Sequence, residues 1–187
     1  MEDNRVPQEL EDDSREKVTL MIEHRLPWLI VGLIGGVIAT VLSSRFGALL
    51  EANIQLAFFI PVIVYMADAV GTQTQSVYIR NLGKDNVRLG TYLLKETLLG
   101  LVIGGLFGLG IGIFSYLWFG EVDTSISVGL AMFLTMASAP IIALIVPTVI
   151  QKEHKDPAVG AGPFTTVIQD VISLMVYFTI ASVIIFG

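Results

Sequence analysis

Long apolar segments alternate with short polar ones along most of the chain. A helix needs roughly 20 apolar residues to cross the hydrocarbon core of a bilayer. Five segments are candidates for this, and they cover residues 27–44, 53–79, 97–119, 124–150 and 158–187. The pattern predicts an all-α membrane protein with five transmembrane helices. We therefore expect residues 1–26 to form an acidic tail and residues 27–187 to form one transmembrane domain.

Composition agrees with lipid as the solvent and excludes several kinds of site. The chain is 53% hydrophobic with a mean hydropathy of +0.74, more apolar than a soluble domain. It has no cysteine and only two histidines, His24 and His154, so neither thiolate nor zinc-like ligand spacing is present. No nucleophile–base pair or phosphate loop is recognisable either. We do not expect an enzyme or a nucleic-acid partner.

Lysine and arginine positions predict the orientation. With five spans the two chain ends lie on opposite sides, and ten of the 11 basic residues fall in the tail and loops on the N-terminal side. Arg45 alone falls on the other side. The positive-inside rule then places the tail in the cytoplasm and Gly187 outside, in a cell membrane (inner or plasma membrane).

Two carboxylates fall in the middle of predicted spans. Asp68 lies 12 residues before Arg80, and Asp170 lies 13 residues after Pro157. At about 1.5 Å per helical residue both reach roughly 18–20 Å from the cytoplasmic ends. No lysine or arginine lies at that depth to balance them, so a cation or a proton must do so. The alternative is a protonated aspartate that packs through hydrogen bonds.

Polar side chains extend from each carboxylate at helical spacing. The two sets are Thr166, Asp170, Ser173 and Tyr177 in the last span, and Tyr65, Asp68, Thr72 and Gln75 in the second. Hydroxyl, amide and carboxylate oxygens suit hard cations such as Mg²⁺, Ca²⁺ or Mn²⁺. Hydroxyls alone also hold membrane helices together, which is the alternative interpretation.

Glycines recur every four residues in two of the spans. They are Gly100, Gly104, Gly108 and Gly112 in the third span, and Gly32 and Gly36 in the first. Small residues at this spacing allow helices to approach closely, so we expect packing surfaces there.

Three sequence motifs resemble one known family. Residues 61–73 (PVIVYMADAVGTQ), followed by Ser76 and Arg80, resemble the second helix of the MgtE family of magnesium channels, and residues 94–96 resemble the start of its third. The most specific motif is residues 156–166 (DPAVGAGPFTT) with Asp170 following, which is similar to the start of the family's last helix. The resemblance extends over residues 25–187.

The resemblance implies a homodimer whose second and fifth helices line a central path for hydrated Mg²⁺. Asp170 takes the role of the selectivity carboxylate. The expected ion site is Asp170, Asp68, Thr166, Thr72 and Gln73, and the expected further pore lining is Tyr65, Gln75, Ser173 and Tyr177. Glu96 and Asp156 correspond to acidic positions near the cytoplasmic mouth, although an ordinary solvated charge is an equal alternative for both.

The sequence departs from the family pattern in the second helix. Ala67-Asp68-Ala69 stands where the family has Gly-Gly-Asn. We hypothesise that Asp68 substitutes for or strengthens the attraction for the cation, and that it widens selectivity toward Mn²⁺, Co²⁺ or Ca²⁺.

A second departure concerns the segment before the first span. Bacterial members carry an N-terminal helical domain and paired CBS domains there, whereas this chain has 26 residues. We expect gating, if any, to come from the tail, a separate regulatory chain or voltage. The tail is either solvated and disordered or contains an amphipathic helix with Val18, Met21, Ile22 and Leu26 on one face.

Taken together, these features favour channel-like Mg²⁺ uptake. The alternatives are Na⁺- or H⁺-coupled exchange of divalent cations, and a membrane subunit that transports nothing.

Overall fold

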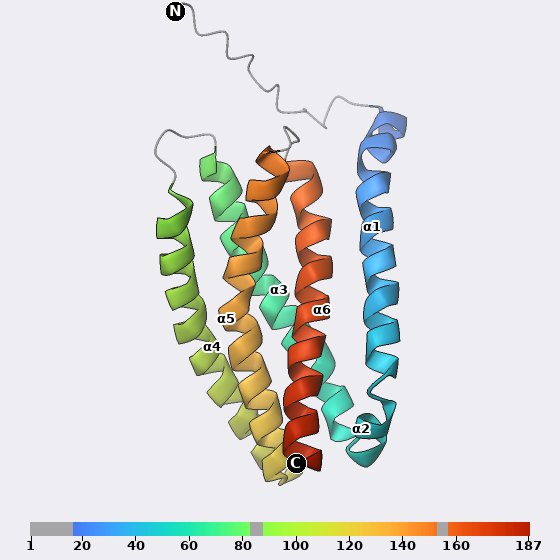
Figure 1. Cartoon of the computed structure of the whole chain (residues 1–187), viewed down its shortest axis with the longest axis vertical. Helices are drawn as coiled ribbons and strands as arrows, with labels where there is room; N and C mark the ends of the chain where they lie inside the picture. Colours follow the sequence, from blue (N-terminus) through green and yellow to red (C-terminus); the bar gives the residue numbers. More distant parts are fainter. Residues whose placement is uncertain (1–16, 83–87, 153–156) are drawn as a thin grey trace, which may run out of the picture.

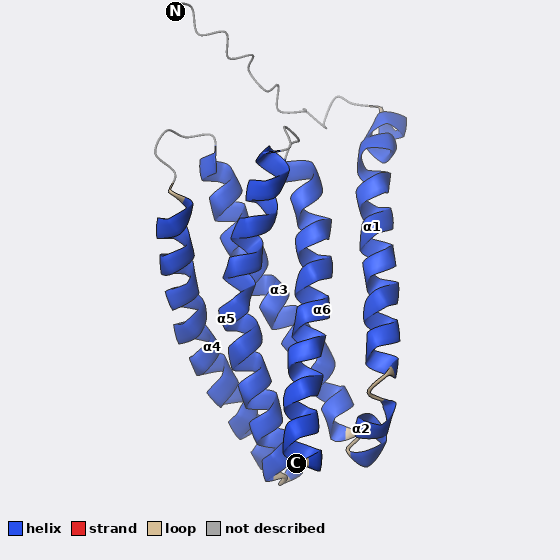
Figure 2. Cartoon of the chain, in the orientation of Figure 1, coloured by secondary structure: helices blue, strands red, loops and turns tan. Residues whose placement is uncertain are grey.

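The computed structural model describes residues 17–82, 88–152 and 157–187. Its elements are α1 (Val18–Ser44), α2 (Gly47–Ala52), α3 (Gln55–Leu82), α4 (Leu89–Phe119), α5 (Val122–Lys152) and α6 (Pro157–Phe186). All regular structure within these ranges is helical (Figure 2). Every helix except α2 contains a stretch long and apolar enough to cross a membrane. The prediction of an all-α protein with five membrane-capable helices is therefore confirmed.

The helices extend beyond the predicted spans, mostly at one end of the bundle. α1 begins at Val18 instead of residue 27, and α4 begins at Leu89 instead of residue 97. A helix of 31 residues such as α4 is about 46 Å long at 1.5 Å per residue, more than the roughly 30 Å of a hydrocarbon core. Polar helix formers such as Lys95 and Glu96 continue the helix past the apolar stretch that hydropathy detects.

The first turns of α1 decide between the two alternatives for part of the tail. Residues 18–26 are helical, so for them the disordered alternative is wrong. Val18, Met21, Ile22 and Leu26 line one groove on the helix surface together with Arg25 and Leu29, so the four predicted residues share one face. Residues 1–16 lie outside the described ranges.

α5 is the central helix and α1 the most peripheral. α5 packs against α3, α4 and α6, whereas α1 packs mainly against α6. Figure 1 shows α4 and α1 at opposite edges of the bundle, with α2 at the end where α1 finishes. We call this the α2 end. Among the α1 residues only Gly35 is buried.

Glycines make the closest helix contacts. A Cβ on Gly108 would lie 2.6 Å from the carbonyl oxygen of Gly129 on α5, and one on Gly104 would lie 2.8 Å from that of Phe133. The packing surface predicted on the third span is thus confirmed. On α1 the close contact is at Gly35, because a Cβ on Gly36 would meet nothing within 4 Å.

Candidate cation site

Three helices line a cavity of about 440 Å³ that is open to the surface of the protomer. Its lining residues are Ala39, Thr40 and Ser43 of α1, Ile60, Pro61, Val64, Tyr65 and Asp68 of α3, and Thr166, Asp170 and Leu174 of α6. Both intramembrane carboxylates found in the sequence therefore face one space. No lysine or arginine is among the residues that line it.

A hydrogen bond joins α3 to α6 at the cavity wall. The Thr166 hydroxyl donates to Oδ1 of Asp68 over 3.0 Å. Asp170 follows Thr166 by one helical turn, which brings it to the same wall. In the described part of the chain, Oδ1 of Asp170 is buried and has no hydrogen-bond partner. A buried carboxylate without a donor is costly when ionised, so Asp170 requires a proton or a nearby cation to balance its charge.

The size and chemistry of the cavity fit a hydrated divalent cation. Six waters at about 30 Å³ each occupy roughly 180 Å³, so the open cavity has room for a hydrated ion. Two ionised carboxylates would balance the charge of one divalent ion. The hydroxyls of Thr166, Thr40 and Ser43 add neutral oxygens of the kind that accept hydrogen bonds from metal-bound water.

The other predicted site residues of α3 differ in their relation to this cavity. Tyr65 lines it and is 69% exposed in the protomer. Thr72 and Gln73 are exposed on α3, about one turn farther from the α2 end than Asp68. They are absent from the lining of this cavity, and their place in an ion path stays a prediction.

Gln75, Ser173 and Tyr177 are buried inside the protomer. Ser173 accepts a hydrogen bond of 3.3 Å from Nε2 of Gln169, and Tyr177 donates one of 2.8 Å to the carbonyl of Leu56. The beginning of α3 thus covers α6 at Tyr177, and none of Gln75, Ser173 and Tyr177 is in the cavity lining. Their predicted contact with an ion path is not tested by this arrangement.

Glu96 lies at the other end of the bundle and is half-buried. Its Oε2 accepts a hydrogen bond of 2.9 Å from the hydroxyl of buried Thr74, which links α4 to α3. Glu96 is therefore more than a freely solvated charge. Asp156 lies outside the described residues.

Sequence reasoning missed the contribution of α1. Thr40 and Ser43 line the cavity, whereas only the second and fifth spans were expected to do so. Three hydroxyl residues, Thr40, Ser43 and Ser44, at the end of the otherwise apolar span 27–44 were the available signal.

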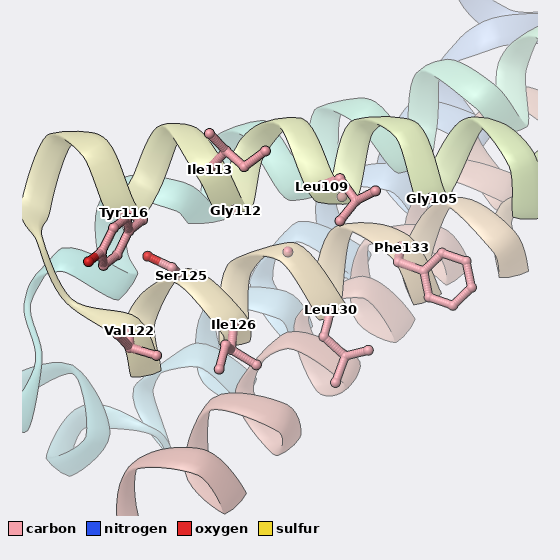
Figure 3. A pocket seen from close by; sticks show the side chains of 12 residues that line it. Gly105, Leu109, Gly112, Ile113, Tyr116, Val122, Ser125, Ile126, Leu130 and Phe133 are labelled. Carbon is pink, nitrogen blue, oxygen red and sulfur yellow. The ribbon is translucent and has the colours of Figure 1, made fainter.

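A larger groove of about 690 Å³ lies between α4 and α5 (Figure 3). Glycines form its floor and large apolar side chains such as Leu109, Ile113 and Leu130 form its walls. The Ser125 hydroxyl at its edge donates to the carbonyl of Glu121. With no carboxylate in its lining, this groove lacks the ligands of a cation site.

Comparisons with known proteins agree with the chemistry of the cavity. Residues 60–180 match the MgtE family, described as divalent cation transporters. The chain is 34% identical over 162 residues to the magnesium transporter MgtE of Bacillus subtilis, and 35% identical over 161 residues to that of Enterococcus faecalis. It is 27% identical over 161 residues to that of Thermus thermophilus.

These alignments cover 84–85% of this chain but only 35–36% of each relative. The chain thus spans just over a third of their length. All three relatives are named as transporters and not as enzymes. The match to the family over residues 60–180, which include both carboxylates of the cavity, identifies this chain as a member of the MgtE family.

Proposed function

We propose that this chain carries Mg²⁺ across a membrane by channel-like uptake, with the cavity as part of the path. The observation that carries this proposal is the convergence of Asp68 and Asp170 on one cavity that has no basic residue in its lining. The names of the relatives supply the ion. Asp170 acts as the selectivity carboxylate. A membrane potential drives a cation inward at about 2.3 kcal/mol per charge per 100 mV.

The exposed polar residues of α3 support a homodimer. Tyr65, Thr72 and Gln73 are exposed in the protomer, although they lie within a membrane-capable helix. Lipid cannot satisfy an amide such as that of Gln73, so this face needs water or protein against it. A second copy that covers α3 and α6 would enclose the cavity and complete a water-filled pore. Gating by a separate regulatory chain belongs to the same proposal.

The orientation follows from the basic residues. Arg25, Arg80 and Lys152 lie toward the end of the bundle opposite α2, while Arg45 lies at the α2 end (Figure 1). We place the end with more basic residues in the cytoplasm and the α2 end outside, in the inner or plasma membrane.

Coupled exchange is the second candidate, and Asp68 favours it. A second carboxylate beside Asp170 gives the cavity a place for Na⁺ or H⁺ during a transport cycle. Uptake of Mg²⁺ into proteoliposomes separates the candidates. A channel gives uptake that is independent of Na⁺ and pH gradients, an exchanger requires one of these gradients, and a chain that transports nothing gives no uptake.

Asp68→Asn tests the part that Asp68 plays in selectivity. We expect lower Mg²⁺ uptake and a changed ratio to Mn²⁺, Co²⁺ and Ca²⁺, because one charge of the cavity is lost. Asp123→Asn is the matched control, since Asp123 is an exposed acid in the first turn of α5. Unchanged flux and selectivity in Asp68→Asn would remove Asp68 from the ion site.

A further inference from the structure

Helix α1 forms the third wall of the carboxylate cavity. Its contribution is Ala39, Thr40 and Ser43, which lie outside the family match that begins at residue 60. Thr40 is exposed and Ser43 is half-buried in the protomer, so both hydroxyls are accessible from the cavity.

The close contact at Gly35 determines the position along the helix axes at which α1 meets α6. A Cβ on Gly35 would overlap the side chain of Val167, so only glycine allows this approach. The two helices run in the same direction (Figure 1). Counted from the contact at about 1.5 Å per residue, Thr40 lies about 3 Å and Ser43 about 8 Å closer to the α2 end than Asp170. The hydroxyls therefore line the side of the cavity between the carboxylates and the α2 end.

The hydrogen bonds of both hydroxyls determine what they offer to the cavity. Thr40 donates to the carbonyl of Gly36 over 2.9 Å, and Ser43 donates to that of Ala39 over 2.9 Å. Each hydroxyl has one proton, so only oxygen lone pairs remain for a ligand. Water bound to a metal ion acts as a hydrogen-bond donor, and Mg²⁺ usually keeps several of its waters. A wall whose hydroxyls offer only hydrogen-bond acceptors suits the water molecules of a hydrated cation and offers no donor to an anion.

We propose that Thr40 and Ser43 are binding residues for the water shell of a hydrated divalent cation, on the α2 side of Asp68 and Asp170. The proposal rests on the proposed transport of Mg²⁺ and extends the binding site to a third helix. The ion keeps its water here, while the carboxylates supply the charge.

Transport by a double variant is the first test. Thr40→Val with Ser43→Ala should raise the Mg²⁺ concentration for half-maximal uptake roughly five- to hundredfold, the range expected for the loss of two ordinary hydrogen bonds. Thr179→Val is the control, because Thr179 is exposed on α6 nine residues after Asp170 and so faces the opposite side of the helix. Its half-maximal concentration should stay at that of the wild type.

Cysteine labelling is the second test and does not depend on transport. The chain has no cysteine, so Thr40→Cys and Ser43→Cys each introduce a single thiol. In proteoliposomes, a membrane-impermeant maleimide should label both, and Mg²⁺ should slow the labelling. Ile38→Cys should stay unlabelled. Ile38 is exposed outside the cavity lining on a membrane-capable helix, where its surroundings are lipid and a water-soluble reagent does not reach the thiol.

The outcomes separate this inference from the proposed function. If the wild type shows no Mg²⁺ uptake, the proposed function fails. The binding role of α1 is refuted, and the proposed function is not, if the wild type transports Mg²⁺ and the double variant has the same half-maximal Mg²⁺ concentration as the wild type. The same holds if labelling is absent or unaffected by Mg²⁺.

Discussion

The contact between α4 and α5 gives a sharp test of the fold. In Gly108→Ala the new Cβ would lie 2.6 Å from the carbonyl oxygen of Gly129. Carbon and oxygen atoms ordinarily stay about 3.3 Å apart, so the two helices must separate by roughly 0.7 Å. The neighbouring Cβ and N atoms of Phe133, at 3.2 and 3.3 Å, leave little room for a sideways shift. Overpacking of this kind destabilises a protein by about 1–3 kcal/mol.

Gly110→Ala is the matched control. It lies on the same helix, and its Cβ would meet nothing within 4 Å. Both substitutions add the same helix propensity of about 1 kcal/mol, so their difference isolates the steric overlap. At about 2–4 °C per kcal/mol, Gly108→Ala should unfold about 2–12 °C below Gly110→Ala. Thermal unfolding in detergent, followed by size-exclusion chromatography, measures this difference. Equal midpoints, or a higher midpoint for Gly108→Ala, would refute the packing.

Two further substitutions test the cavity walls. Thr166→Val removes the donor to Asp68, and a hydrogen bond to a charged group contributes about 1.5–3 kcal/mol. The Mg²⁺ concentration for half-maximal uptake should therefore rise about tenfold or more, and Thr166→Ser should recover most of the loss. Wild-type uptake by Thr166→Val would contradict a role for this hydrogen bond. Gly35→Ala should lower both thermal stability and Mg²⁺ uptake because its Cβ overlaps Val167, whereas Gly36→Ala should leave uptake unchanged and should not lower stability, since it adds helix propensity without a steric overlap. Equal behaviour of these two variants would contradict the α1–α6 contact.

The number of membrane-capable helices could be predicted from the sequence because the bilayer requires long apolar helices. Their ends could not, since Lys95 and Glu96 continue α4 although they lower its hydropathy. The short helix α2 also could not be predicted from the hydrophobic pattern, because its six residues are too few to show a period.

Asp68 and Asp170 could be paired from depth alone, because both lie near the middle of apolar spans. Spacing within one helix could not tell which neighbours share their cavity. The helical spacing of Tyr177 places it near the face of Asp170. Its hydroxyl nevertheless donates a hydrogen bond to the carbonyl of Leu56 at the beginning of α3. Thr40 lies on a helix whose partner is determined by a tertiary contact, the approach of Gly35 to Val167.

The central claim is that Mg²⁺ crosses the membrane past Asp170. The most direct measurement is the initial rate of Mg²⁺ uptake into proteoliposomes that contain either the wild type or Asp170→Ala, at equal amounts of folded protein. We predict clear uptake by the wild type and a rate close to that of empty liposomes for Asp170→Ala. Undiminished uptake by Asp170→Ala would contradict the assignment of the ion site.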